Sequence, residues 1–232
     1  ESIPSIPAND TVYYTFAGTA NMAAAGNYRV EAEVMYPTDT YDINDTTSTE
    51  LTNTPVITVT NATPHLQNFE TDNGYWYTLG NSSWEYGTPA SYKINRAASG
   101  SKAWKTRLAG NYDDNTAAIL YSPCYDVSTM ANPTLSFSLA LDLEDCGAGF
   151  CDGAYVEYST DGRTWSRLGT NGQGFNWYNK SYTSNNLWSV QNYHRWHVAT
   201  IPLSVTGIPV AQLTQLRFRF VVSSDPAVNR DG

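Results

Sequence analysis

The feature of this sequence that most constrains its fold is the alternation of apolar and polar side chains with a period of two. Every odd position from 135 to 143 is Leu or Phe, while the even positions between them carry small or polar side chains. Residues 28–36 and 215–223 alternate in a similar way. Because successive side chains on a strand point to opposite faces, this period predicts strands with one buried face. No segment shows the helical period, so we predict an all-β protein.

The composition agrees with strands and limits the partners. The 232 residues include 17 Tyr, 7 Trp and 7 Phe, and aromatic side chains favour pleated, half-buried surfaces. The 22 acidic residues outnumber the 13 Lys and Arg, and the basic residues form no cluster along the sequence, so nucleic acid and anionic membranes are poor partners and no nucleic-acid binding is expected. Without a run of 18 apolar residues, no membrane insertion is expected. Because the chain begins at Glu1 without Met or a signal segment, we interpret it as a processed product or a fragment.

Turn-forming residues divide the chain into two expected modules. The segment Asn61-Ala-Thr-Pro64 interrupts the alternation, and we place a boundary there. Residues 1–61 contain about four short strands, at 11–16, 28–36, 49–51 and 56–60, fewer than a complete immunoglobulin-type sandwich needs, so we expect a partial Ig-like module. Residues 65–232 contain about ten, which suits a jelly-roll sandwich, with a long loop at 169–193. The ten expected strands lie at 66–70, 74–79, 91–96, 102–108, 117–121, 134–143, 153–159, 164–168, 195–202 and 215–223.

Several strings in the second module carry a family resemblance. They are Asn68-Phe-Glu70, Gly100-Ser-Lys-Ala-Trp104, Leu120-Tyr-Ser-Pro-Cys-Tyr-Asp-Val-Ser128, Pro133-Thr-Leu-Ser-Phe137 and the run from Asp152 to Trp165. Together they resemble the MAM-like, concanavalin-type jelly rolls of Bacteroidetes surface proteins, whose relatives include the cleaved-adhesin modules of some secreted proteases. The resemblance implies a secreted or surface-displayed binding module.

The resemblance extends, more loosely, to the first module and to the end of the chain. Gly26-Asn-Tyr28 and the segment Asp42–Thr46 are similar to the closing half of the CARDB-like immunoglobulin modules that often precede such jelly rolls. In the family a further strand follows the Asp-Gly pair, whereas this sequence stops at Asp231-Gly232. The resemblance therefore implies that the jelly roll lacks its last strand. No type IX sorting domain is present, so anchoring signals are expected outside this fragment.

The three cysteines indicate the redox compartment. Cys146 and Cys151 flank a short loop whose glycines allow its ends to meet, and a disulfide there implies an oxidising exterior. Zinc binding is the alternative, although a second pair of ligands is lacking nearby. Cys124 is expected to be a buried thiol.

Two acidic regions are candidates for calcium, which prefers oxygen ligands. The turn from Phe69 to Gly74 contains Glu70, Asp72 and an amide, and an Asx turn with solvated charges explains it equally well. The resemblance implies a calcium ion held by the opening Glu and the closing Asp, here Glu70 and Asp231. A second cluster beside the Cys loop is either a metal site or a solvated loop; it comprises Asp142, Glu144, Asp145 and Asp152.

Aromatic and amide side chains crowd the long loop at 169–193. Trp177, Tyr178 and Trp188 stand among several Asn residues, and flat rings beside amides suit the apolar faces and hydroxyls of sugars. The alternative is that these rings cap an open edge of the sandwich. Trp165 and Trp196 are expected in the core.

Catalytic motifs are missing from the sequence. His194 and His197 would face opposite sides of a strand, so they can share a metal only across a bulge. There is no HExxH, no GxSxG and no phosphate-binding glycine loop, although the many carboxylates leave a glycosidase open. We therefore expect a non-catalytic adhesion or ligand-binding module of a larger exported bacterial protein, with a glycan or a host or cell-surface protein as partner. The alternatives are a carbohydrate-binding accessory module of a secreted hydrolase or protease, and a type IX secretion cargo fragment held by its translocation machinery.

Overall fold

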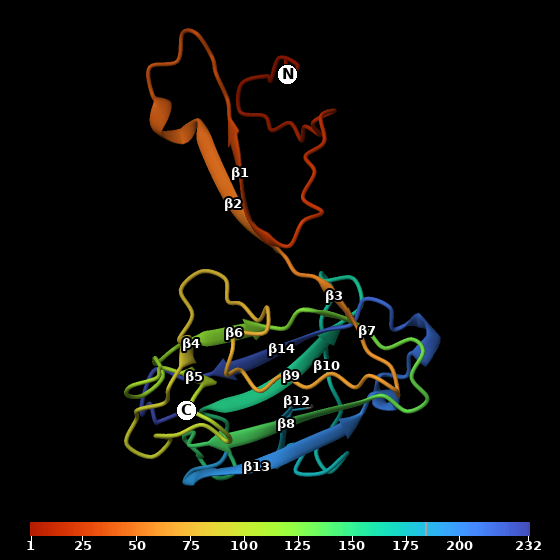
Figure 1. Ribbon diagram of the computed structural model, residues 1–232. Coiled ribbons are helices and arrows are strands. Elements are labelled where there is room, and N and C mark those ends of the chain that lie inside the picture. Colours follow the sequence, from red (N-terminus) through yellow and green to blue (C-terminus); the bar gives the residue numbers. More distant parts are fainter. Residues whose placement is uncertain (184) are drawn as a thin grey trace. The chain divides into compact units, whose positions relative to one another are not determined.

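The computed structural model describes residues 1–183 and 185–232, and these residues confirm the all-β prediction (Figure 1). Besides strands they contain three 3-10 turns of three or four residues, and no helix among them is long and apolar enough to cross a bilayer. The elements in chain order are β1 (Gly26–Glu33), η1 (Asp42–Asn44), β2 (Thr46–Asn53), β3 (Val56–Thr58), β4 (Trp84–Gly87), β5 (Ala103–Thr106), β6 (Ala117–Tyr121), β7 (Cys124–Asp126), β8 (Thr134–Leu141), β9 (Gly153–Ser159), β10 (Ser166–Arg167), β11 (Lys180–Tyr182), β12 (Asn185–Leu187), β13 (Tyr193–Pro202), η2 (Leu203–Thr206), η3 (Val210–Gln212) and β14 (Arg217–Ser223).

The chain forms two compact units, an N-terminal unit of Glu1–Thr54 and a C-terminal unit of Pro55–Gly232. This division falls before the expected boundary at residues 61–65. The strand expected at 56–60 appears as β3, which pairs in parallel with β7 of the C-terminal unit. The assignment of the two units to an Ig-like and a jelly-roll module stays a prediction.

The N-terminal unit is built on one antiparallel hairpin of β1 and β2, in register from Gly26 opposite Asn53 to Glu33 opposite Thr46. Alternation places Tyr28 and Val30 on one face, but Val30 is still 40% exposed. The strand expected at 11–16 is absent, and those residues form no ladder. A two-stranded hairpin alone buries little apolar surface, so this unit has no substantial core of its own.

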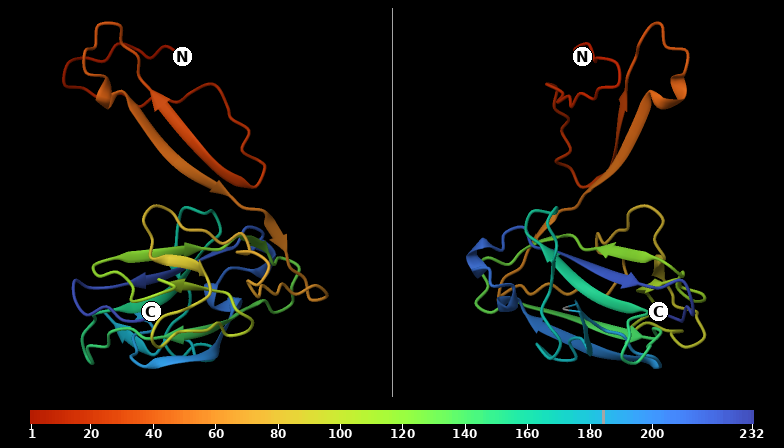
Figure 2. Two further views of the ribbon diagram at one scale, coloured as in Figure 1. Left: turned by 60° about the vertical axis from the view of Figure 1, so that its left-hand side comes forward. Right: turned by 180° about the vertical axis from the view of Figure 1, so that it is seen from behind.

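The C-terminal unit has two layers of strands around one core (Figure 2). One layer is the antiparallel sheet β10-β9-β14-β6, and the other contains the antiparallel pair β13-β8. The layers meet where the ring of Phe137 from β8 contacts that of Phe220 from β14, with centroids 4.8 Å apart. The apolar faces that the alternation predicts for β8 and β14 therefore point toward each other, into the core between the two layers.

Among the strands of residues 1–183 and 185–232, β8 pairs with β13 alone, on one of its two edges. On the β13 side, Leu143 N–H donates to the Val190 carbonyl at 3.0 Å. On the opposite side, Asp142 N–H donates to the Gly232 carbonyl, and Gly232 N–H donates back to the Asp142 carbonyl. The backbone groups of even-numbered residues in β8 therefore point to the edge on which Gly232 pairs with Asp142, and no named strand of the described residues pairs there.

Segments 66–70 and 91–96 were predicted as strands and are irregular, and 74–79 contributes a single bridge from Tyr77 to Tyr121. Around the first segment, Phe69, Gly74 and Tyr75 have positive φ, which interrupts a pleated ladder. Conversely, the long loop expected at 169–193 contains the short hairpin of β11 and β12.

Candidate functional site

Three carboxylates meet at one end of the C-terminal unit. The carboxylate oxygens of Glu144, Asp152 and Asp225, here called the acidic centre, all lie within 4.8 Å of one another. Asp152 is fully buried, and the other two are half-buried. Oxygen ligands at this spacing suit a hard divalent cation such as calcium.

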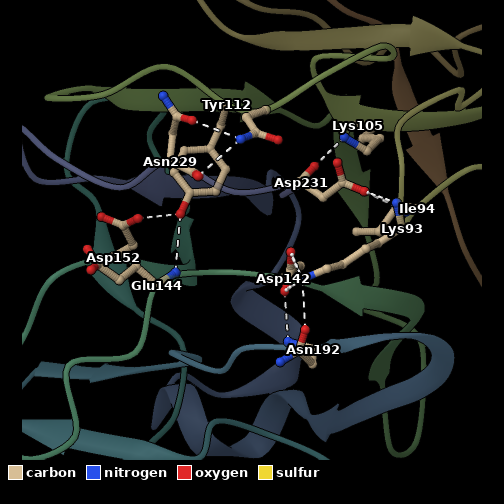
Figure 3. A network of polar contacts seen from close by, with 11 residues as sticks. Lys93, Ile94, Lys105, Tyr112, Asp142, Glu144, Asp152, Asn192, Asn229 and Asp231 are labelled. Carbon is tan, nitrogen blue, oxygen red and sulfur yellow. Dashed lines mark hydrogen bonds and ion pairs between the residues drawn. The ribbon is translucent and has the colours of Figure 1, made fainter.

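Strand pairing explains how the acidic centre forms. Asp152 directly precedes β9, and Asp225 follows β14 by two residues. Because β9 and β14 are antiparallel with Gly153 opposite Ser223, the start of one strand lies beside the end of the other. Glu144 comes from the segment after β8, and its N–H donates to the hydroxyl of Tyr112 at 3.2 Å (Figure 3).

Buried donors fix the orientation of Asp152. The Tyr112 hydroxyl donates to one carboxylate oxygen, and Asp225 N–H donates to the other at 2.9 Å. Burial nevertheless raises the pKa of the Asp152 carboxyl, and the charge of Asp225 raises it further. The pKa of Glu144 is also raised, by burial first and then by Asp225 and Asp152. Carboxyl groups that resist ionising together are stabilised by a proton or by a bound cation.

Two members of the predicted acidic cluster serve other purposes. Asp142 is 1% exposed and forms a salt bridge with Lys93 at 2.8 Å, while Asp145 pairs with Lys180 at 2.9 Å. The cluster is thus neither a single metal site nor a solvated loop. Glu144 and Asp152 are joined instead by Asp225. The position of Asp225 depends on the pairing of β9 with β14, which no local sequence motif predicts.

Asp231 closes a neighbouring polar network (Figure 3). Its carboxylate accepts hydrogen bonds from the backbone N–H groups of Lys93 and Ile94. Its own carbonyl accepts from the ammonium of Lys105, which also donates to the carbonyls of Thr106 and Arg107. Burial lowers the pKa of Lys105 to about 8, although the Asp231 carboxylate opposes the shift. The network binds the end of the chain to the two segments that contain Lys93 and Lys105.

The carboxylates of the expected calcium ligands Glu70, Asp72 and Asp231 do not form one cluster of potential metal ligands among the described residues. Glu70 accepts from the N–H groups of Ser101 and Lys102, and these bonds hold its pKa below the usual range. Asp72 accepts from Gly74 N–H at 2.8 Å, the Asx turn that was the alternative. Backbone donors thus occupy each carboxylate separately, and among the described residues the three form no common cluster.

The expected disulfide between Cys146 and Cys151 is present, with Cα atoms 5.8 Å apart. Glu144, Cys146 and Cys151 form a second group of potential metal-ligand atoms that lie within 4.8 Å of one another. Because the two sulfur atoms are joined in the disulfide, they are not free thiolates that could bind a metal. Cys124 is a free, buried thiol in β7.

The predicted sugar platform needs correction. Trp177, Tyr178 and Trp188 are 2%, 5% and 4% exposed, so they are core residues and cannot present a surface to a glycan. Their rings pack against one another, and those of Trp177 and Trp188 also pack against Phe137. Trp165 and Trp196, which were expected in the core, are half-buried instead.

The histidines are separated by a bulge in β13. The register shifts between Tyr193 and His197, and the His197 ring packs against that of Tyr193 in a tilted arrangement, with centroids 4.2 Å apart. Across residues 1–183 and 185–232, no cluster of three potential metal ligands includes a histidine. The bulge therefore does not create a histidine metal site within the described chain.

Comparisons with known proteins give one limited similarity. No family model matches the chain. The chain is similar to Bacillopeptidase F of Bacillus subtilis (strain 168), with 34% identity over 116 residues. The match covers 49% of this chain but only 8% of that protein, so the chain corresponds to a small part of the relative's length.

Proposed function

We propose that this chain is a non-catalytic, calcium-stabilised binding module of a larger exported bacterial protein, with adhesion to a glycan or a surface protein as its role. The acidic centre carries the calcium part of the proposal, because three converging carboxylates are costly to ionise without a cation. The Cys146–Cys151 disulfide supports export, since such bonds persist in oxidising surroundings.

The similarity to Bacillopeptidase F supports an accessory role. The matched stretch of 116 residues has the size of one module and makes up 8% of a protein whose name describes a peptidase. A module of this kind, attached to a much longer chain, fits the binding role expected from the MAM-like resemblance. In the proposed arrangement the parent protein supplies any catalytic part, and this chain supplies recognition.

Calcium titration followed by thermal unfolding tests the proposal. A ligand held only by the folded state stabilises it by about 2.7 kcal/mol at a hundred times its Kd, and for a unit of this size that raises Tm by several degrees. EDTA-treated protein should therefore melt at a higher temperature when calcium is added back. The variant Glu144→Gln should lose this shift.

The matched control is Glu70→Gln, which removes a carboxylate from the other predicted calcium position. It should keep the calcium-dependent shift. If Glu70→Gln loses the shift and Glu144→Gln keeps it, calcium binds at Glu70 and not at the acidic centre. If calcium at millimolar concentration does not change the Tm of the unmodified chain, calcium binding is refuted.

The open edge of β8 favours a second candidate function, a cargo fragment completed by a strand from another chain. Strand addition to an exposed edge uses main-chain hydrogen bonds and needs no specialised pocket. Co-purification of a partner that protects the β8 amides from hydrogen exchange would support this candidate over the first.

A further inference from the structure

A cavity of about 220 Å³ in the C-terminal unit lies outside the acidic centre. One wall is residues 93–96, and the other is residues 194–196 of the β13 bulge. We call it the basic pocket, because its lining contains Lys93, Arg96, His194 and Arg195 and no acidic side chain. The charged side chains of this lining, Lys93, Arg96 and Arg195, are all cationic, although the chain as a whole has a net charge of −9.

The bulge frees the second wall from the sheet. Tyr193 lies opposite Leu141 and His197 opposite Leu139, so three residues of β13 stand against the single residue Ala140. Bulged residues leave the regular ladder, and bulges often redirect side chains beside binding sites. Arg195 is exposed in this bulge, and His194 and Trp196 are half-buried beside the pocket.

A hydrogen bond joins the two walls. The indole Nε1 of Trp196 donates to the carbonyl of Arg96 at 2.9 Å. This bond holds the Trp196 ring in place while leaving it half-buried at the pocket. A fixed aromatic face beside polar donors can stack on the apolar face of a sugar ring.

Most of the positive charge in the pocket is not neutralised by the protein. Lys93 is the exception, since its ammonium pairs with Asp142 at 2.8 Å and also donates to Asn192. Arg96 and Arg195 take part in none of the ion pairs formed by the described residues. The Nδ1 atom of His194 is buried without a hydrogen-bond partner. The exposed guanidinium groups of Arg96 and Arg195 can be satisfied together by an anionic ligand that accepts several hydrogen bonds.

We infer that the basic pocket binds the carboxylate of an acidic sugar, with Arg96 and Arg195 holding the carboxylate and Trp196 contacting the ring. Arginine matches the planar, bidentate geometry of a carboxylate better than other side chains do. The cavity is smaller than the roughly 300–1,000 Å³ that accommodates drug-sized ligands, so it takes one sugar residue and not an oligosaccharide. This inference rests on the proposed binding role and names the ligand class.

Titration of the whole chain with sodium glucuronate, followed by NMR and calorimetry, tests the inference. Glucuronate should shift the indole resonance of Trp196. Glucose and sodium acetate should each bind about tenfold more weakly, because each offers only one half of the recognised group. Acetate binding as tightly as glucuronate would overturn the sugar assignment.

Variants locate the site. Arg96→Gln and Arg195→Gln should each weaken glucuronate binding by about tenfold, since each removes a charged hydrogen-bond donor. The matched control is Arg163→Gln, which changes an exposed guanidinium in the turn at 160–163 and should leave binding unchanged. Unchanged binding in Arg195→Gln, with Tm preserved, would overturn the inference.

The calcium experiment keeps the two proposals distinct. If EDTA lowers Tm while glucuronate fails to bind, the acidic sugar site is refuted and the calcium-stabilised module stands. If glucuronate binds without any calcium effect, the calcium part of the proposed function is refuted and the basic pocket stands.

Discussion

Asp142 and Gly232 exchange both of their backbone hydrogen bonds, at 2.5 and 3.1 Å, in the manner of an antiparallel pair. This exchange sets a register in which further residues after Gly232 would run along the open edge of β8. The first would lie opposite Leu141 and the third opposite Leu139. Cross-strand neighbours share a face, so these positions favour apolar side chains.

A strand appended to Gly232 in this register should stabilise the C-terminal unit. We expect Val-Thr-Val-Thr-Val-Thr-Val to raise Tm and to protect the amides of Ser136, Ser138 and Ala140 from hydrogen exchange. The control, Thr-Val-Thr-Val-Thr-Val-Thr, places its apolar side chains on the opposite face and should do neither. Equal effects of the two sequences would contradict the register.

The acidic centre should make the calcium-free protein less stable as pH rises above about 4, the ordinary carboxyl pKa. Burial raises the pKa values of Glu144 and Asp152, so the folded chain binds protons more tightly than the unfolded chain. The contribution of these two carboxyls to the free energy of unfolding therefore falls while the pH passes through the interval up to the raised pKa values, whereas carboxyls with lowered pKa values, such as Glu70, contribute a rise. In urea unfolding with EDTA, the stability of Glu144→Gln relative to the unmodified chain should therefore increase as the pH rises through this interval. Identical pH profiles for Glu144→Gln and the unmodified chain would contradict charge repulsion among the three carboxylates of the acidic centre.

Removal of the Asp142 charge should destabilise the protein strongly. The variant Asp142→Asn leaves the ammonium of Lys93, which is only 24% exposed, without a counter-ion. We expect a loss of about 2–3 kcal/mol, less than for a fully buried pair. Asp145→Asn breaks the more exposed pair with Lys180 and should cost about 1 kcal/mol or less. Urea midpoints at an unchanged m-value would provide the measurement.

Trp188 should behave as a core residue. Its ring packs on Tyr178 with centroids 4.6 Å apart, and its Nε1 donates to the Asn176 carbonyl at 3.0 Å. Trp188→Ala should therefore cost about 3–5 kcal/mol of stability. Tyr92→Ala, at a ring that is 91% exposed, should cost no more than about 0.5 kcal/mol. If Trp188→Ala leaves thermal stability unchanged, the ring is not a core residue and the hypothesis of an exposed, sugar-binding ring is supported instead.

The strands that the sequence predicts best are those whose alternation is long. The segment 153–159 appears unchanged as β9, and 134–143 and 215–223 appear as β8 and β14 with slightly shorter bounds. Period two is a property of one strand and its two faces, so it can be read locally. Short strands such as β11 and β12 contain too few residues to show a period.

The candidate site was harder to predict because it depends on contacts between distant segments. Asp225 reaches Asp152 only through the pairing of β9 with β14, which the sequence does not specify. The prediction that the rings at 169–193 form an exposed sugar-binding surface is wrong for a different reason. Their Asn neighbours, which resembled sugar-binding amides, bond to the protein backbone instead: Asn176 donates to the Val198 carbonyl and Asn179 to the Ser189 carbonyl.

The burial of Cys124 has a consequence for handling the protein. An odd thiol in an oxidising medium would ordinarily cross-link neighbouring molecules, but this one is 1% exposed. Its sulfur meets another chain only after the surrounding strands have separated. Covalent dimers on a non-reducing gel would therefore record how many molecules have unfolded during storage.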